Sequence, residues 1–581
     1  MNIPRFKFGS WRSLMPKKID LSWYSLVIAG TIAMTTGAVR AADSVKLGFG
    51  PIERAVPVTE LETYAKQGRI GKELDVFLGA IPQRDRQYIR EFLRTRADFS
   101  ERQVAQFLNS TFGKKLLVYL GDLVQVERDV NGAKAIRTGL ISAAADREGL
   151  SVINFFRKYP TPSVRLNLEK GFEVANRLDR LDRDTKQIVA GVEQLSAQLA
   201  RSEPKINPQV LPNLALAGQY PVTRQTETLR DRRRSRRFIV DFYLPQGVPQ
   251  RRPTVVFSHG LASDRQHFAA IARHIASHGF VAVTIEHPGS DLKQLQNLLE
   301  GRRKEVFDPR EFGDRPQDVS YVLDELERRF PGLANVQQAG VVGHSFGGYT
   351  ALALAGATID FDYLQTQCRQ GIDAANASLL LQCEALKLPR QSDNFRDPRI
   401  SFALAINPVA SSVFGPQGMA QVQIPVAIVA GNEDTIAPAA IEQVQPFTWL
   451  VAPERYLFVV RGLGHVVDAR SLTTAFMPSL SNVIADNKIP PLSQYGRTFV
   501  LALVQTHVAR QSSYRAYLQA DYALTISQAP NQVSILRSLT PAQLEAIFQS
   551  PVATSDLDRR QLITRLQRRI EERNTPLPLK K

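Results

Sequence analysis

Cysteine is almost missing from this chain of 581 residues, which has two, Cys368 and Cys383. Neither lies in the cysteine and histidine spacing of a zinc site, and the chain has no glycine-rich phosphate-binding loop, so we expect no metal and no cofactor. Two cysteines this close together, with no metal partner, predict a disulfide, and a disulfide indicates an oxidising compartment. A pair of buried free thiols is the alternative.

Acidic residues are also few: 56 aspartates and glutamates stand against 73 lysines and arginines, which gives a net charge of +17. Part of the excess lies in runs such as residues 230–237 (RDRRRSRR) and 302–304. Such runs are typical of solvated faces, of surfaces that bind anionic lipid and of nucleic-acid sites. Because no nucleic-acid-binding module accompanies the charge, we exclude nucleic acid and keep a membrane surface as an expected partner.

Charge is absent from residues 21–39. Lysines and arginines precede this stretch, and the small residues that end at Ala41 fit a cleavage site. Residues 1–41 therefore predict an export signal, which would leave the mature chain periplasmic or secreted. The stretch is also about long enough to span a bilayer, so an uncleaved membrane anchor is the alternative.

The rest of the chain divides by pattern. Apolar residues recur at three- and four-residue steps over residues 45–170 and predict a helical N-terminal domain. Residues 171–212 have the pattern of a charged helix and a proline-spaced linker. Residues 213–490 alternate strands with helices around an insertion, 359–399, that carries both cysteines and could act as a lid. Residues 491–581 predict a helical C-terminal extension.

The region that alternates strands and helices predicts an α/β fold. Short apolar runs such as 254–258 (TVVFS), 402–406 and 426–430 predict strands, and helical stretches separate them. Such alternation implies a mostly parallel sheet with helices on both faces. Ligands of these folds bind at the carboxyl ends of the strands.

A strand-turn-helix signal lies at residues 343–348 (GHSFGG). An apolar run precedes it and an alanine-rich stretch follows, which is the context of a G-x-S-x-G nucleophile elbow. In such a turn the serine, Ser345, has a strained backbone, and Gly343 and Gly347 avoid steric collisions. The sequence therefore predicts a serine nucleophile.

Two histidines, His465 and His507, follow this serine in the chain. In α/β architectures of this kind the base comes after the nucleophile. His507 lies within a helical pattern, whereas His465 follows a strand and a glycine-rich turn (GLGH) from which it can reach back to Ser345. We predict that His465 is the base.

A carboxylate must orient that imidazole and offset its charge. Strand 426–430 is followed by GNED, which offers Glu433 and Asp434. We select Asp434 and keep Glu433 as the alternative. Asn407 ends the preceding strand, but an amide cannot offset an imidazolium, and Asp468 is interpreted as a helix cap.

Two backbone N–H groups are expected to stabilise the oxyanion of acyl transfer. One belongs to Phe346, at the start of the helix after the serine, and the other to Leu261, in the loop after the first buried strand. His259 in that loop precedes the nucleophile and is expected to hold the loop by hydrogen bonds. His287 and His344 either touch substrate or serve the structure.

The segments VVFSHGL (255–261), ASHGF (276–280) and RPQDV (315–319), together with the elbow GHSFGG, resemble the platelet-activating-factor acetylhydrolases and related dienelactone-hydrolase-like α/β-hydrolases. The likeness covers about residues 219–468. The layout as a whole also resembles predicted cyanobacterial α/β-hydrolases, which are exported chains with a helical N-terminal domain of unknown role.

The resemblance implies an α/β-hydrolase fold and assigns nucleophile, base and oxyanion roles to Ser345, His465, Leu261 and Phe346. It departs at Asn407, where the acetylhydrolases carry their aspartate. Asp434 instead matches the position that most other α/β-hydrolases use.

Together these features predict an exported, metal-independent carboxylic ester hydrolase with Ser345, Asp434 and His465 as its triad. Short-chain or phospholipid-like esters are the expected substrates, on the resemblance and the basic charge. The alternative is an envelope binding or scaffold protein that kept the fold and lost turnover; an intact set of three residues argues against it.

Overall fold

The computed structural model describes residues 42–49, 52–369, 371, 375–391, 394–465 and 490–549. The predicted export signal and Asp468 lie outside these residues. Within them, no helix has both the length and the apolar character needed to cross a membrane.

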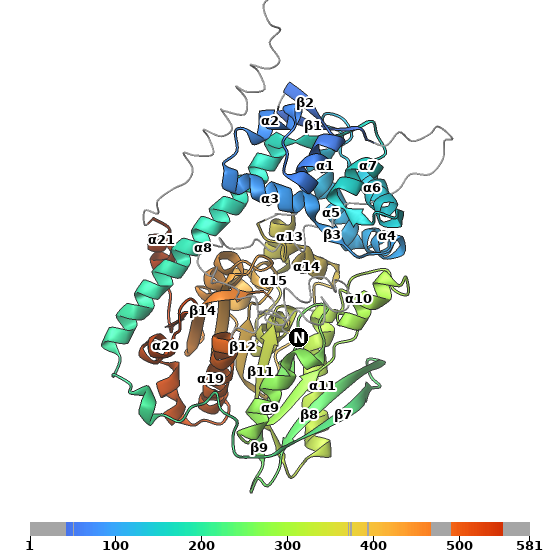
Figure 1. Cartoon of the computed structure of the whole chain (residues 1–581). Coiled ribbons are helices and arrows are strands. Elements are labelled where there is room, and N and C mark those ends of the chain that lie inside the picture. The colour runs from blue at the N-terminus through green and yellow to red at the C-terminus, as the bar shows by residue number, and fades with distance from the viewer. Residues whose placement is uncertain are drawn as a thin grey trace, which may run out of the picture.

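A nine-stranded sheet forms the centre of the larger domain, which lies below the N-terminal domain in Figure 1. Neighbouring strands are parallel from β10 through β9, β11, β12 and β13 to β14, and β8, β7 and β15 add antiparallel pairs at the two edges. In sheet order the strands are β15 (Val533–Leu536), β14 (Arg455–Gly464), β13 (Val426–Glu433), β12 (Ile400–Ile406), β11 (Ala334–His344), β9 (Arg252–Ser258), β10 (Val281–Ile285), β8 (Arg236–Pro245) and β7 (Val222–Asp231).

Helices pack on both faces of this sheet. Successive residues of a strand point to opposite faces, so Val256 lies in one apolar core and its neighbours Val255 and Phe257 lie in the other. The first core includes residues of α11 (Glu311–Arg329), α12 (Phe346–Ala355), α15 (Ser411–Met419) and α16 (Gln445–Phe447), and the second includes residues of α9 (Ala269–Ser277), α19 (Pro490–His507) and α20 (Ala520–Ile526). The predicted α/β-hydrolase fold class is confirmed.

The order of the strands changes direction beside β9. The chain passes from β9 to β10 on one side, and then places β11 on the other side of β9. Ligands of open α/β sheets bind at such a switch point, outside the carboxyl ends of the strands. The loop after β9 and the turn after β11, which the sequence singles out, both lie at this point.

The N-terminal domain is mainly helical, as expected from the sequence, and it also contains two small sheets. Its four-stranded sheet has the order β2-β1-β6-β4, and β3 pairs with β5. In β1, Val45 is buried, Ser44 is half-buried and Lys46 is exposed, so the burial follows no two-residue alternation that would have marked a strand in the sequence. The strands are β1 (Ser44–Phe49), β2 (Ile52–Pro57), β3 (Arg96–Ala97), β4 (Val124–Gln125), β5 (Leu150–Ser151) and β6 (Ser163–Asn167), and the helices are α1 (Val58–Gln67), α2 (Lys72–Leu78), α3 (Gln83–Arg94), α4 (Glu101–Asn109), α5 (Thr111–Leu123), α6 (Ala133–Ala145) and α7 (Val152–Lys158).

The predicted charged helix is α8 (Leu168–Ser202), 35 residues long, which Figure 1 shows running from the N-terminal domain along the side of the sheet. The second half of this helix has a buried face. Ile188, Val189 and Val192 are buried, and the hydroxyl of Ser196 accepts a hydrogen bond from the N–H of Ile535 in β15. The helix therefore packs against the edge of the sheet.

The described part of the C-terminal region, residues 490–549, packs on the hydrolase domain and adds a strand to its sheet. α19 buries Leu501, Leu503 and Val504 against one face of the sheet, and β15 pairs with β14. After β15, α21 (Pro541–Gln549) packs on α8, where Ile547 meets Gly191. The apolar side chains of α19 explain this placement, because one face of the central strands would otherwise be open to water.

The insertion contributes α13 (Phe361–Arg369), α14 (Leu379–Gln382) and the short helix η4 (Cys383–Lys387). Cys368 and Cys383 form a disulfide between α13 and η4. The buried carboxylate of Glu442 accepts hydrogen bonds from Asn376, Ser378 and Gln382 of the insertion. These bonds hold the insertion against the core of the hydrolase domain.

Candidate active site

The turn between β11 and α12 has the geometry of a nucleophile elbow. Ser345 lies in it with φ 56° and ψ −116°, and its N–H donates to the carbonyl of Ile406 at 2.9 Å. A Cβ on Gly343 would lie 1.9 Å from the carbonyl oxygen of Gly347, and one on Gly347 would lie 1.9 Å from that of Ser258. Both positions therefore require glycine.

Ser345, His465 and Asp434 meet at the carboxyl edge of the sheet. The Nε2 atom of His465 lies 2.9 Å from the Oγ atom of Ser345, and its Nδ1 atom lies 2.7 Å from Oδ2 of Asp434. The other carboxylate oxygen of Asp434 accepts the N–H groups of Ile436 and Ala437. The carboxylate is buried and the imidazole is 9% exposed, so both are held in a fixed orientation.

The alternatives to these residues lie elsewhere. The side chain of Glu433 is exposed, and the imidazole contacts its neighbour Asp434 instead. His507 is buried at the end of α19. Its ring stacks on Phe402 of β12, and its Nε2 atom lies 3.2 Å from the hydroxyl of Tyr456. Burial lowers the pKa of His507 to about 4.

Asn407 connects the two loops that carry the histidine and the acid. Its side-chain amide donates to the carbonyl of Gly464, and its side-chain oxygen accepts the N–H of Gly431 at 3.0 Å. The residue is fully buried with φ 41°. Sequence reasoning rejected Asn407 as the acid but did not find this role.

His344 contacts the histidine loop rather than open space. Its Nε2 atom lies 2.5 Å from the carbonyl oxygen of His465, which requires Nε2 to donate. Burial lowers the pKa of His344 well below the usual value, so the ring is neutral. Of the two readings that the sequence left open for His344, this contact favours the structural one.

The loop after β9 lies directly against the nucleophile. A Cβ on Gly260 would come within 3.3 Å of the Cβ of Ser345. Among the described residues, no group accepts a hydrogen bond from the N–H of Leu261 or of Phe346. Two amide donors without acceptors beside a serine are what an oxyanion site requires.

His259 fixes this loop, as expected from the sequence. Its Nε2 atom accepts the N–H of His287 at 3.1 Å, so the Nδ1 atom, 2.7 Å from the carbonyl of Gly260, carries the proton. Burial and the positive charge of Arg315 lower the pKa of His259 well below its usual value. A neutral ring of this tautomer orients the peptide between Gly260 and Leu261.

A second set of serine, histidine and aspartate lies behind the loop. The Nε2 atom of His287 lies 3.0 Å from the hydroxyl of Ser258, and its Nδ1 atom lies 2.9 Å from Asp318. All three residues are fully buried. Because no substrate can reach Ser258, this set belongs to the support of the site.

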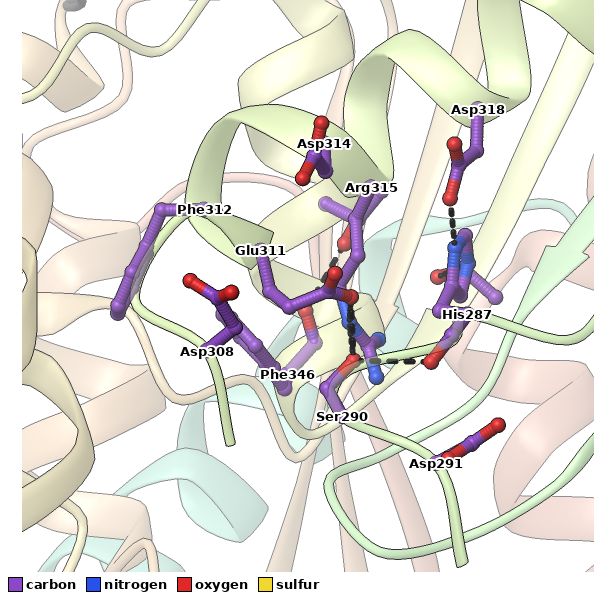
Figure 2. A network of polar contacts seen from close by, with 12 residues as sticks. His287, Ser290, Asp291, Asp308, Glu311, Phe312, Asp314, Arg315, Asp318 and Phe346 are labelled. Atoms are coloured by element: carbon purple, nitrogen blue, oxygen red, sulfur yellow. Dashed lines mark hydrogen bonds and ion pairs between the residues drawn. The ribbon is translucent and has the colours of Figure 1, made fainter. Parts of the chain in front are cut away.

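Part of the basic run at 230–237 folds inward. Arg234 and Arg236 donate to Asp318, and Arg234 also pairs with Asp231. Figure 2 shows Glu311, Arg315 and Asp318 on α11, close to the loop that carries His287 and Ser290. Arg315 and Asp318 lie at helical spacing with Val319 and Val322 on the buried face, which is the sequence signal that could have marked them.

Within the part of the chain that the structure describes, no group of three or more His, Cys, Asp or Glu side chains could hold an ion.

Two families match parts of the chain. Residues 41–167 match a family described as "Alpha/beta hydrolase of unknown function (DUF1400)", and this segment is the N-terminal domain, ahead of the nine-stranded sheet. Residues 244–294 match "Platelet-activating factor acetylhydrolase, isoform II", from the end of β8 through the loop of Leu261 into α10 (Leu292–Leu299). A comparison with curated proteins finds no significant match.

The fold is that of the α/β-hydrolases, and the two family matches support a hydrolase. Within that class, the chain resembles the platelet-activating-factor acetylhydrolases in the segment that builds the loop beside the nucleophile. The disulfide is compatible with an exported protein, because disulfides persist in oxidising compartments.

Proposed function

We propose that this protein is a serine carboxylic ester hydrolase whose triad is Ser345, Asp434 and His465. The observation that carries the proposal is the pair of contacts of His465, 2.9 Å to the nucleophile and 2.7 Å to the acid. A serine hydroxyl becomes nucleophilic at neutral pH only when a base takes its proton. The imidazole lies in hydrogen-bond reach of that proton.

In the acylation step, Oγ of Ser345 forms a bond to the ester carbonyl carbon while its proton passes to Nε2 of His465. The carbonyl oxygen becomes an oxyanion between the N–H groups of Leu261 and Phe346. Asp434 accepts the Nδ1–H of His465 and offsets the imidazolium charge. When the tetrahedral intermediate collapses, the alkoxide leaves and takes the proton from His465 as an alcohol.

In the second step, water repeats the sequence on the acyl-enzyme. His465 takes a proton from the water as its oxygen adds to the acyl carbon, and returns it to Oγ of Ser345 as the carboxylic acid departs. The enzyme is then unchanged, and no cofactor enters either step.

Short-chain or phospholipid-like esters are the substrates we favour, with acetyl esters first. The support is the likeness to the acetylhydrolases around Leu261. Within the basic run, Arg234 and Arg236 are used in internal ion pairs, so the exposed arginines at 230, 232, 233 and 237 are the ones that could meet an anionic lipid surface. Turnover of p-nitrophenyl esters graded from acetyl to palmitoyl would define the acyl length.

The test uses the full chain, p-nitrophenyl acetate and a fluorophosphonate probe. Wild-type protein is expected to turn over the ester and to be labelled at residue 345. Ser345→Ala should lose labelling and at least about 10⁴-fold in kcat. Ser258→Ala is the matched control: it removes a second serine hydroxyl that contacts an imidazole, that of His287, and should keep labelling and turnover. Wild-type protein that shows neither labelling nor turnover would instead support the binding or scaffold alternative.

A further inference from the structure

Arg315 is a fully buried arginine that touches both parts of the oxyanion site. Its Nη1 atom donates to the carbonyl of His259 at 2.6 Å, and Nη2 lies 3.4 Å from the carbonyl of Gly260. Its guanidinium carbon lies 4.4 Å from the ring centroid of Phe346. It contacts neither Ser345 nor His465.

The contacts with the loop determine where one N–H group points. The carbonyl of Gly260 and the N–H of Leu261 belong to one planar trans peptide, so they point in opposite directions. His259 and Arg315 both hold that carbonyl. Rotation of the peptide, which would turn the Leu261 N–H away, would break both hydrogen bonds.

The contact with Phe346 acts on the other donor. A guanidinium over an aromatic face attracts the ring, and Phe312 packs on the same ring at 4.8 Å between centroids. Because the ring and the N–H belong to one residue, holding the ring at the start of α12 restrains that N–H.

The position of the guanidinium is itself fixed from α11 and from the loop before α10. The Nε atom of Arg315 donates to the hydroxyl of Ser290 at 2.9 Å, and that hydroxyl donates to Glu311 (Figure 2). Burial lowers the pKa of Arg315 to about 10, so the group stays charged at neutral pH. Burying a cation costs free energy. An arginine is nevertheless suited to this position, because its planar guanidinium can donate to two carbonyls and a hydroxyl at once.

We propose that Arg315 is a positioning residue that holds the N–H groups of Leu261 and Phe346 at the separation an oxyanion requires. The inference rests on the proposed function. It predicts that Arg315 matters to the transition state and little to the binding of a planar ester, since the amide donors are needed once negative charge develops on the carbonyl oxygen.

The test compares Arg315→Lys with wild-type protein. Loss of one oxyanion donor costs about 10²- to 10³-fold in kcat, and we expect Arg315→Lys to lose about 10²-fold with KM changed less than about 3-fold. Affinity for a trifluoromethyl ketone, which becomes a tetrahedral adduct on Ser345, should weaken by about the same factor. Affinity for the matching methyl ketone, which stays planar, should be retained.

Arg234→Lys is the control, because Arg234 lies in the same ion cluster, bonded to Asp231 and Asp318, and touches neither oxyanion segment. It should keep wild-type kcat. Phe346→Leu is a second variant that leaves every buried charge paired, and should lower kcat about 3- to 10-fold with the same selective loss of the trifluoromethyl ketone.

The proposal is overturned if Arg315→Lys keeps kcat within about 3-fold of wild type, or if both ketones weaken equally in it. If Arg315→Lys does not fold, Phe346→Leu decides by the same two criteria. Absence of ester turnover in the wild-type protein would refute the proposed function and is thereby distinguished from failure of this inference.

Discussion

At the residue scale, two side chains of the site answer different physical needs. Asp434 supplies a charge: its buried carboxylate faces the imidazole and has a second oxygen satisfied by backbone N–H groups. Asn407 supplies geometry: its amide joins the backbone at Gly464 and Gly431. An asparagine suits this second role, because it can donate and accept at once and tolerates a positive φ.

Substitution of Asp434 should therefore mainly lower kcat, whereas substitution of Asn407 should mainly lower stability. Asp434→Asn should lower kcat about 10⁴-fold with little change in stability, because an amide stabilises neither the tautomer nor the imidazolium. Asn407→Ala should keep much more activity but lose about 1–3 kcal/mol of stability, from the loss of two side-chain hydrogen bonds, one of them buried, and from alanine at positive φ. Turnover of p-nitrophenyl acetate and urea unfolding would measure both. The reverse ranking of kcat would exclude Asp434 as the acid.

At the element scale, the helices show which faces are packed. α8 looks solvated in sequence because charges alternate along its first half, yet its second half lies against β15 and α21. Gly191 marks the close approach: a Cβ there would lie 2.5 Å from a side-chain carbon of Ile547. Gly171, near the start of the same helix, has no atom within 4 Å of that position.

Substitution by alanine at these two glycines should thus have opposite effects on stability. Gly191→Ala should push α21 away at a cost of about 1–2 kcal/mol, seen as about 5- to 30-fold faster hydrogen exchange in residues 541–549. Gly171→Ala should leave α21 unchanged and stabilise the start of α8 by about 0.5–1 kcal/mol, the difference in helix propensity. Slow exchange of α21 in Gly191→Ala would show that the two helices do not meet there.

At the scale of the whole molecule, the N-terminal domain docks beside the carboxyl edge of the sheet. Glu305, in the segment after α10, accepts the backbone N–H and the hydroxyl of Thr111 at the start of α5. Lys115 of α5 pairs with Glu384 of the insertion, and Arg102 of α4 donates to the carbonyl of Glu300. The carboxylate of Glu305 lies at the N-terminus of α5, where the positive end of the helix dipole also stabilises it. The domain of unknown role is therefore joined to the segments around the site.

Glu305→Ala should weaken this docking. Loss of two hydrogen bonds to a carboxylate costs about 1.5–3 kcal/mol, and amide exchange around Thr111 should accelerate while that of β11 and β12 stays slow. Glu300→Ala is the matched control, because the bond from Arg102 goes to the backbone carbonyl of Glu300 and the substitution leaves that carbonyl in place. Equal amide hydrogen-exchange rates around Thr111 in the two variants would show that Glu305 does not hold the domain.

The sequence by itself determined the features that local rules produce. Glycine on both sides of Ser345 predicts a turn that no other residue fits. A histidine that follows a strand and a glycine predicts the loop of His465. The alternation of strands and helices predicts a parallel sheet. Only the tertiary structure decided that Arg315 is buried, that Asn407 joins two loops, and that β15 completes the sheet. Each of these three features depends on residues that are distant in the chain. The chemical type of a side chain does not predict whether it is buried, because burial is decided by the distant residues that pack around it.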